Sequence, residues 1–324
     1  MISLDISKCY GFDKHRSGWG YCINSLRPFH SYSGIHVDGF VEHNFCWHIE
    51  DYFYGGAKSH IPYKKPWIGF IHNPPNPPNW FDMYNSPVAM FSREVFRQSL
   101  KCCKAIIVLS DYLKTWVEEM CDVPCISVKH PTETNVPKWS PEKYINCDSP
   151  TLLQVGYWLR KLESIVDIKV PYPFIKKWLP SHKGYAEELL AVYNRTKLDF
   201  FEGRYKWSGV ELLDWVSHED YDTMLTSGIV FLDLYDSSAN NAVIECIARN
   251  TPLLVNRHPA VVEYCGEDYP LYFEDLDHAS SLLVDTDKII LAHKYFKSMD
   301  KSWLNGSYFA NDLTTKLERV VSCL

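Results

Sequence analysis

Short runs of apolar residues recur along the whole chain, separated by more polar stretches. Several are rich in Ile, Val and Leu without strict alternation of apolar and polar positions, which is typical of strands covered on both faces. The pattern predicts strands at residues 35–41, 67–71, 105–109, 125–129, 151–155, 198–201, 229–234, 252–255 and 271–273. Strands of this kind indicate parallel sheets.

The segments between the strands repeat their apolar residues at helical spacing. Residues 94–103 and 111–120 each place large apolar side chains along one side, and Ser110 is positioned to cap the second helix. Ser217 and Asp220 form a capping-box pattern at the start of another helix. A final helix is expected from a shared apolar face of Leu313, Leu317, Val320, Val321 and Leu324.

Alternating strands and helices predict βαβ units and an α/β fold. Residues 131–150 contain four prolines and few apolar side chains, and they divide the pattern into two halves. We therefore expect two Rossmann-like domains, at residues 1–140 and 141–300, with residues 301–324 as a helix that packs back on the body. Substrates bind in the cleft between such domains, at the carboxyl ends of strands.

Composition narrows the function classes. The length of 324 residues agrees with two domains of about 150 residues each. A net charge of −7, with no run of more than two Lys or Arg, argues against a nucleic-acid partner. No apolar stretch reaches about 18 residues, and no signal-peptide pattern opens the chain, so no transmembrane segment is expected. The 11 cysteines include no Cys-x-x-Cys pair, which fits reduced thiols in a cytoplasmic protein.

The most distinctive segment follows the strand predicted at residues 229–234. Residues 236–241 have no bulky side chain, so their backbone can approach a ligand closely. Asn240 or Asn241 can cap a helix that begins near Ala242. The free N–H groups and partial positive charge at the start of such a helix suit a diphosphate.

Glu245 lies one turn into this helix. The expected buried face consists of Val243, Ile244, Ile247 and Ala248, which leaves Glu245 off the core. A carboxylate in this position can accept hydrogen bonds from two neighbouring ribose hydroxyls. It can equally be a solvated glutamate near the favourable end of a helix, and this segment alone leaves both interpretations open.

A series of segments in the C-terminal half occurs in a telling order. These are Leu152 to Gly156, Arg160-Lys161, Phe200 to Gly203, residues 217–226 and 228–234, the Glu245 helix, Thr251 to Val255, and Ala260 to Gly266. Together, over about residues 151–281, they resemble the donor domain of the GT-B glycosyltransferases, specifically the retaining GT4-type family. In the N-terminal half, Cys102 to Ser110 resembles that family's last N-domain strand, and Val128 to Pro131 the segment leading to the linker.

The resemblance implies the two-domain GT-B architecture, with an acceptor-side N-terminal domain and a C-terminal domain for the nucleotide-sugar donor. It implies transfer of a hexose or pentose from a nucleotide diphosphate sugar to a carbohydrate or glycoconjugate acceptor, with retention. It also implies that no metal or other cofactor is needed. Asp233 and Asp236 are therefore not assigned to a metal, since this fold uses basic residues and helix ends in place of a divalent cation.

Site residues follow from the resemblance. The family has a basic pair after a glycine-ended strand that contacts the donor diphosphate, and Arg160 and Lys161 follow Gly156 in this way. Fixed positive charge would stabilise the departing diphosphate, and the ordinary alternative is a surface basic pair. Glu245 matches the glutamate that holds the donor ribose. The family usually has a second glutamate eight residues earlier, where this chain has Ser237.

Two further candidates lie in the N-terminal half. His72 follows the strand predicted at residues 67–71 and precedes Asn73 and two prolines, and the resemblance implies that it faces the donor across the cleft. The alternative is a structural histidine at a strand end. Residues 16–20 resemble the family's early glycine loop, which would bring Gly18 near the donor phosphates or the acceptor, and an ordinary turn is the alternative.

Two other functions stay open. Nucleotide-sugar 2-epimerases share this architecture, but they need additional acid and base carboxylates in the cleft, which the sequence does not identify. A degenerate domain that binds a nucleotide sugar without turnover is favoured by Ser237 standing where the family has a glutamate.

Overall fold

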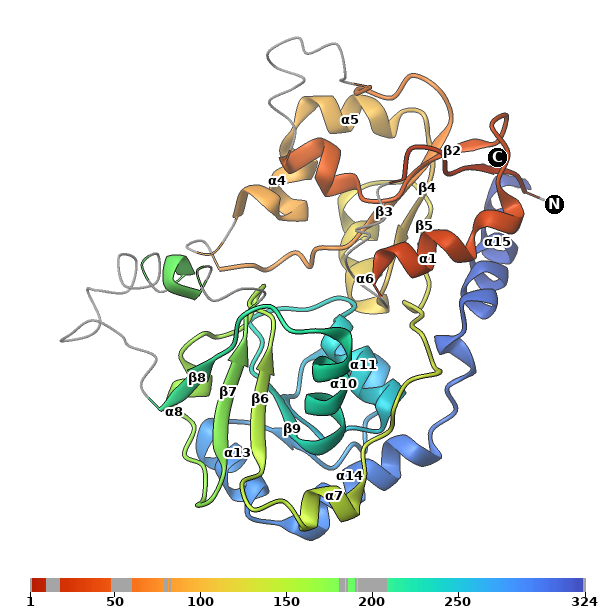
Figure 1. Ribbon diagram of the computed structural model, residues 1–324. Helices are drawn as coiled ribbons and strands as arrows, with labels where there is room; N and C mark the ends of the chain where they lie inside the picture. The colour runs from red at the N-terminus through yellow and green to blue at the C-terminus, as the bar shows by residue number, and fades with distance from the viewer. Residues whose placement is uncertain are drawn as a thin grey trace.

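Two parallel β-sheets, one in each half of the chain, form the framework of this computed structural model (Figure 1). It describes residues 2–9, 18–47, 60–78, 81, 83–180, 184, 186–189, 191 and 209–322. Over these residues the first sheet has the strand order β1-β2-β3-β4-β5, and the second has the order β11-β10-β9-β6-β7-β8. The predicted pair of Rossmann-like α/β domains is confirmed.

The first sheet and the helices that follow its strands form the N-terminal domain. Its strands are β1 (Leu4–Asp5), β2 (Ile35–Asp38), β3 (Trp67–Ile71), β4 (Cys103–Val108) and β5 (Cys125–Ser127). Its helices are α1 (Trp19–Ser25), η1 (Arg27–Phe29), η2 (His43–Trp47), η3 (Met83–Asn85), α4 (Pro87–Ser92), α5 (Glu94–Leu100) and α6 (Asp111–Met120). Ser110 caps α6, as predicted.

Helices cover both faces of this sheet, which explains its uninterrupted apolar strands. Within β3, Ile68 and Phe70 join a core cluster on the face of α1, whereas Trp67 and Ile71 join a cluster with α4, α5 and α6 on the opposite face. Successive side chains of a strand point to opposite faces, so every residue of β3 is buried.

The second sheet belongs to the C-terminal domain. Its strands are β6 (Thr151–Val155), β7 (Ile175–Leu179), β8 (Val210–Leu212), β9 (Ile229–Leu232), β10 (Leu253–Asn256) and β11 (Tyr272–Phe273). The helices are α7 (Pro141–Ile145), α8 (Ser164–Asp167), α10 (His218–Ser227), α11 (Asn241–Arg249), α12 (Pro259–Cys265), α13 (Leu276–Leu283) and α14 (Thr286–Ser298). Ser217 caps α10, since its hydroxyl accepts from the N–H group of Asp220. The Asp220 carboxylate accepts from the Ser217 hydroxyl and not from its backbone N–H group, so the predicted capping box forms only in part.

The strand order of the second sheet locates its binding edge. Counted from β6, the strands follow the order 3-2-1-4-5-6 of dinucleotide-binding folds, and the direction of winding reverses between β6 and β9. Ligands bind α/β sheets in the crevice at the carboxyl ends of the strands that flank such a reversal.

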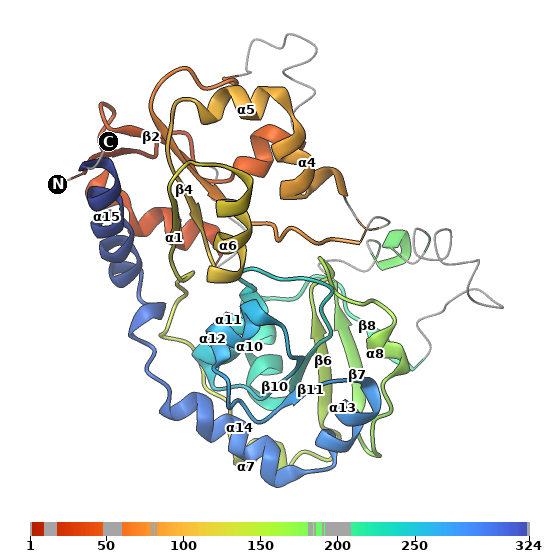
Figure 2. The same ribbon diagram turned by 180° about the vertical axis from the view of Figure 1, so that it is seen from behind.

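The chain finally crosses back to the N-terminal domain. Past the short helix η5 (Ser302–Leu304), α15 (Gly306–Ser322) runs beside α1, and both views place it along the N-terminal domain (Figures 1 and 2). Phe309, Leu313 and Leu317 of α15 are buried in the same core cluster as Ile68 and Phe70. The final helix is present as expected, although Leu324 lies outside the described residues.

The prediction also missed elements. β1, β7 and β8 were not expected, and the strand predicted at residues 198–201 lies outside the described residues. The strand predicted at residues 35–41 ends at Asp38, because helical structure begins at Val41.

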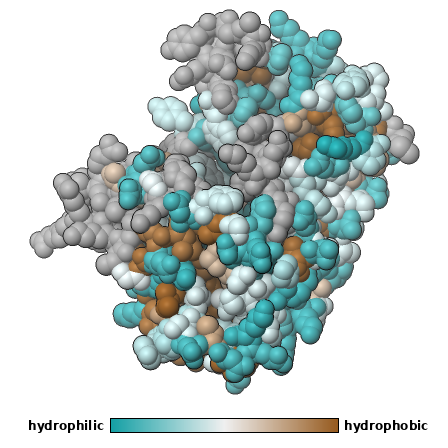
Figure 3. Space-filling model, viewed as in Figure 1, coloured by the Kyte–Doolittle hydropathy of each residue, from teal (hydrophilic) through white to brown (hydrophobic). Residues whose placement is uncertain are grey.

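The face drawn in Figure 3 mixes hydrophilic and hydrophobic areas, with a hydrophobic patch on the C-terminal domain. No helix in the described ranges is long and apolar enough to cross a membrane.

Candidate functional site

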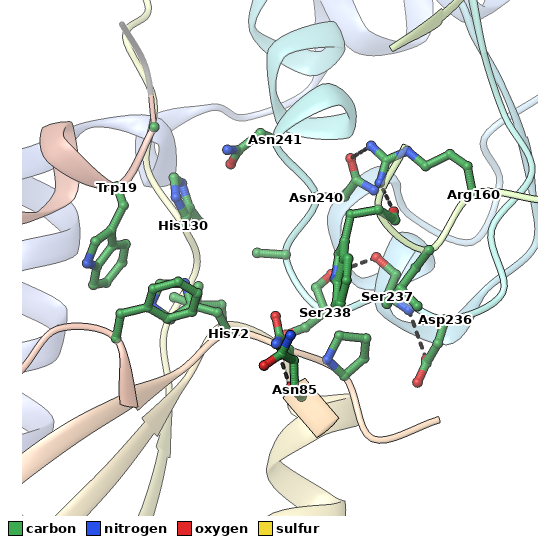
Figure 4. Close-up of a pocket in the computed structure, with 18 of the residues that line it drawn as sticks. Trp19, His72, Asn85, His130, Arg160, Asp236, Ser237, Ser238, Asn240 and Asn241 are labelled. Carbon is green, nitrogen blue, oxygen red and sulfur yellow. Dashed lines mark hydrogen bonds between the residues drawn. The ribbon is translucent and has the colours of Figure 1, made fainter. Parts of the chain in front are cut away.

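A cavity of about 630 Å³ lies between the two domains. On the N-terminal side its lining includes His72 and His130, which follow β3 and β5, and Trp19 at the start of α1. On the C-terminal side it is lined by residues 157–160, after β6, and 236–241, after β9 (Figure 4). These two segments flank the reversal of strand order, where a ligand is expected in this fold.

Helix α11 begins at the cavity wall. Asn240 caps it, since its Oδ1 atom accepts a hydrogen bond from the N–H group of Ala242 at 3.1 Å, and Asn241 is the first helical residue. Both asparagines line the cavity. The predicted start of this helix is therefore correct, and its first N–H groups lie where they can bind an anion.

The Arg160 guanidinium reaches the same wall. Its Nη2 atom donates to Asn240 Oδ1 at 3.3 Å, while Nε and Nη1 donate to the carbonyl oxygens of Val155 and Trp158. A guanidinium carries five N–H donors, so these three bonds leave two for a ligand. Burial lowers the pKa of Arg160 to about 10, and the side chain still keeps its charge at neutral pH.

Gly156 contributes to this arrangement indirectly. Its φ of 75° is in the left-handed region that favours glycine. A Cβ atom at this position would come within 3.3 Å of Arg160 Nη2. Gly156 is not part of the cavity lining, and its effect is to leave space for the guanidinium.

Lys161 does not accompany Arg160 to the cavity. Its Nζ atom lies 2.8 Å from Asp233 Oδ1, and its backbone N–H group donates to the Asp233 carbonyl oxygen. Asp233 is buried and also accepts a hydrogen bond from Ser164. Neighbours in the sequence thus have different surroundings: Arg160 lines the cavity, and Lys161 pairs with a buried carboxylate behind it.

Glu245 lies off the core, as its helical position predicts. The four apolar residues expected to form the buried face of α11 are all buried, and Glu245 is half-buried. It is four residues after Asn241, so both occupy the same side of the helix. The Glu245 carboxylate accepts a hydrogen bond from the hydroxyl of Tyr221 in α10, and Glu245 itself does not line the cavity.

The turn before α11 presents Asp236, Ser237 and Ser238 to the cavity. Asp236 Oδ1 accepts hydrogen bonds from the Ser237 N–H group at 2.8 Å and from His258 Nε2 at 2.9 Å. Ser238 Oγ lies 2.9 Å from Ser110 Oγ in the N-terminal domain. Ser237, the candidate at the position of the family's glutamate, is buried and donates through its hydroxyl to the Ser238 carbonyl oxygen.

His72 forms part of the opposite wall. The N–H group of His72 donates to the carboxyl group of Glu42, and the Nε2 atom of His72 lies 3.0 Å from the Gly39 carbonyl oxygen. A carbonyl oxygen can only accept, so Nε2 carries the proton. Burial lowers the pKa of His72 to about 3, so the ring is neutral and Nδ1 is a hydrogen-bond acceptor.

His130 is a second neutral histidine on this wall, and we did not predict it as a site residue. Its Nδ1 atom lies 2.6 Å from the Pro131 carbonyl oxygen, and burial lowers its pKa to about 4. Nδ1 therefore carries the proton and Nε2 is an acceptor, with the Cys22 sulfur 3.5 Å away. Trp19 packs against both histidines, with ring centroids 4.4 Å from His72 and 6.0 Å from His130.

Other aromatic residues complete the wall. Gly18 lines the cavity beside Trp19, whereas the rest of the predicted glycine loop before it lies outside the described residues. Phe40 and Trp47 also line it, with their rings in edge contact at 4.7 Å. Trp47 is 40% exposed. Aromatic faces of this kind can pack on the apolar face of a sugar ring.

The part of the chain that the structure describes contains no group of three or more His, Cys, Asp or Glu side chains arranged to bind a metal. Asp233 and Asp236 make contacts within the protein. Asp233 pairs with Lys161, and Asp236 is hydrogen-bonded to His258.

Comparison with known proteins identifies the architecture. The sequence matches no protein-family model and no curated protein. Among solved structures, Alr3699/HepE of Anabaena in complex with UDP and glucose aligns with a TM-score of 0.58 at 11% identity, over 78% of this chain and 71% of that one. Trehalose-6-phosphate synthase of E. coli, bound to UDP-2-fluoro glucose, aligns with a TM-score of 0.53 at 10% identity, over 93% and 77%.

The α,α-trehalose-6-phosphate synthase of Burkholderia multivorans aligns with a TM-score of 0.54 at 10% identity, over 94% of this chain and 77% of that one. At such low identity the likeness concerns the path of the chain alone. The alignment extends over both domains, in agreement with the two sheets described above. The chain therefore has the two-domain GT-B fold that its sequence led us to expect.

Proposed function

We propose that this chain is a glycosyltransferase that takes its sugar from a nucleoside diphosphate sugar bound in the interdomain cavity. The observation that carries the proposal is the convergence of the α11 N-terminus and the Arg160 guanidinium at the reversal of strand order. Two of the structural neighbours hold UDP or a UDP-sugar. UDP-glucose is thus the first donor to test.

The reaction breaks the bond between the sugar C1 atom and the diphosphate and forms a bond from C1 to an acceptor hydroxyl oxygen. Negative charge develops on the diphosphate as it leaves, and its oxygen is a suitable destination for the hydroxyl proton. In our proposal the two remaining N–H donors of Arg160 and the first N–H groups of α11 stabilise that charge. No metal is assigned to this role.

Sugar hydroxyl groups are donors, and they require acceptors on the other wall. We assign His72 Nδ1 and His130 Nε2 to this task, because both rings are neutral and have their proton on the other nitrogen. The exposed ring of Trp47 supplies an apolar surface for a carbohydrate acceptor. Retention at C1 and the contact of Glu245 with the donor ribose are parts of the same proposal.

A binding panel followed by a turnover assay tests this function. UDP, GDP and ADP would be titrated by calorimetry, and UDP-glucose would then be incubated with the protein, with and without mixed glycoside acceptors. We expect one of the three nucleoside diphosphates to bind selectively and glucose to be released slowly from UDP-glucose. Inversion at C2 would indicate an epimerase, and binding without any release would indicate a protein that has lost turnover. Absence of diphosphate binding would refute the proposal.

A further inference from the structure

Helix α6 of the N-terminal domain begins at the interface with the C-terminal domain. The first N–H groups of a helix have no partner inside it. In α6 the Ser110 hydroxyl accepts the N–H of Leu113, whereas the N–H groups of Asp111 and Tyr112 donate to the carboxylate of Glu263, at 2.6 and 2.7 Å. Glu263 belongs to α12 of the other domain.

Burial raises the pKa of Glu263, whereas its two hydrogen bonds from the α6 N–H groups favour the carboxylate over the neutral acid. The two carboxylate oxygens each take one N–H group, and negative charge is favoured at the positive end of a helix. Lys129 Nζ donates to the carbonyl oxygen of Glu263 at 3.1 Å. The next residue, Tyr264, donates its hydroxyl to the carbonyl oxygen of Leu109, which precedes the α6 capping residue Ser110. The end of α12 is thus joined to the start of α6 at several points.

The same end of α6 reaches the cavity. Ser110 contacts Ser238 through their hydroxyl groups, and the N–H group of Asn76 donates to Asp236 Oδ2 at 2.7 Å. The side chain of Asn76 in turn donates to the Tyr112 hydroxyl at 2.8 Å. Asp236 and Ser238 line the cavity, so the position of α6 is coupled to the turn before α11.

We propose that Glu263 is a positioning residue for the cleft: by docking on the α6 N-terminus it fixes the distance between the two cavity walls. Glu263 is outside the cavity lining, and both of its carboxylate oxygens are already bound by the N–H groups of α6. It acts through α6, Ser110 and Asp236 on the geometry between the donor side and the histidine side. This inference rests on the proposed function for its kinetic part only.

The test compares Glu263→Ala, Glu263→Gln and the control Glu267→Ala. Glu267 lies just after α12 and pairs with Arg257 inside the C-terminal domain. We expect hydrogen exchange at the Asp111 and Tyr112 amides to accelerate in Glu263→Ala, less in Glu263→Gln, and not in the control. Turnover of UDP-glucose should fall by at least about tenfold in Glu263→Ala, because a small displacement of reacting groups is costly. The dissociation constant for UDP should change little, since Arg160 and α11 remain in place.

Unchanged exchange at both amides would overturn the inference, as would equal losses of UDP affinity and turnover, which would place Glu263 in the donor site. If Glu263→Ala does not fold, amide protection is compared between the wild type and Glu263→Gln. Lower protection in Glu263→Gln supports the inference, and equal protection overturns it. If the wild type shows no turnover, the proposed function fails while amide exchange still tests the docking role.

Discussion

Among the cavity-lining residues within the described ranges, Arg160 and Asp236 are the charged ones, since His72 and His130 are neutral. Asp236 accepts hydrogen bonds from His258 and from the N–H group of Asn76, so both of its carboxylate oxygens are already bound by protein donors. Arg160 has donors left over. A diphosphate entering the cavity would therefore find its main electrostatic partner in one guanidinium.

The adjacent basic residues give a matched pair of variants. Arg160→Gln should raise the dissociation constant for UDP at least tenfold, or about 1.4 kcal/mol, because a charge-assisted contact is lost. Lys161→Gln should leave that constant nearly unchanged and instead lower the melting temperature, because Asp233 loses its ion-pair partner in a buried position. Calorimetric titration and thermal melting separate the two effects. Equal losses of affinity would show that both residues contact the diphosphate.

Glu245 gives a second prediction at this scale. Glu245→Gln keeps the shape of the side chain but removes its charge and one acceptor, so UDP affinity should fall by roughly 1–3 kcal/mol if the carboxylate holds the ribose. Tyr221→Phe should weaken binding less, because it removes only the hydroxyl that orients Glu245. Titration of both variants with UDP checks this order, and unchanged affinity in Glu245→Gln would exclude the ribose contact.

Among the elements, α11 combines a structural role with the proposed binding role. Asn240 caps the helix and also accepts from Arg160, so a simple truncation would disturb both. The predicted start and buried face of α11 agree with the structure because the capping residue and the 3.6-residue period are local signals.

Replacing Asn240 by Asp separates these roles. Aspartate is as good a helix cap as asparagine, so the melting temperature should hold or rise. A second negative charge at the cavity wall would repel a diphosphate, and the dissociation constant for UDP should increase about tenfold or more. Melting curves and calorimetry check this, and tighter UDP binding in the variant would contradict an anion site at this helix end.

Local signals also explain which elements could be predicted. The strands β3 and β6 match their predicted bounds because each is a short apolar run, and α6 matches because a helical period follows a capping serine. β7 escaped prediction because Lys176 and Lys177 interrupt its apolar run, and both lysines are only half-buried in the structure. β1 is two residues long and gives no period at all.

The site could be predicted only where it follows a local pattern. Asn240 and Arg160 lie beside a helix start and a glycine-ended strand, which are visible in the sequence. His130 and Trp19 come from segments more than one hundred residues apart, and only the folded chain brings their rings together. Lys161 was grouped with Arg160 because they are adjacent, but the sequence does not encode that Asp233 lies within reach of one and not of the other.

At the scale of the whole molecule, buried ionisable groups make the stability of the fold depend on pH. Two histidines lower it at acidic pH, and one glutamate lowers it as the pH rises. Burial holds the pKa values of His72 and His130 below their ordinary 6.5, so the unfolded chain takes up more protons as the pH falls below about 6.5, and stability declines there. Burial raises the pKa of Glu42 to about 8. The folded chain therefore keeps a proton that the unfolded chain releases above about pH 4.5. The contribution of Glu42 to the free energy of unfolding is full below that pH and is lost as the pH rises towards 8.

Glu42→Gln should remove the alkaline decline. The amide keeps a carbonyl oxygen for the N–H groups of His72 and Asn73, which Glu42 binds in the wild type. Relative to the variant, the wild type should lose up to about 1.4 kcal/mol of unfolding free energy per pH unit between pH 5 and 8. Urea denaturation at several pH values measures this, with Glu94→Gln, at an exposed position, as the control. Parallel profiles for wild type and Glu42→Gln would show that Glu42 ionises normally.

The return of α15 to the N-terminal domain has a consequence for the order in which the protein can be made. Residues 306–322 are synthesised after the C-terminal domain, yet Phe309, Leu313 and Leu317 complete the core around Leu4 and Trp19, which are synthesised before that domain. Helix α15 contributes nothing to the main core of the C-terminal domain, which can form as soon as Leu304 has emerged. We therefore expect that, during synthesis, the core of the N-terminal domain closes only after the C-terminal domain has been made.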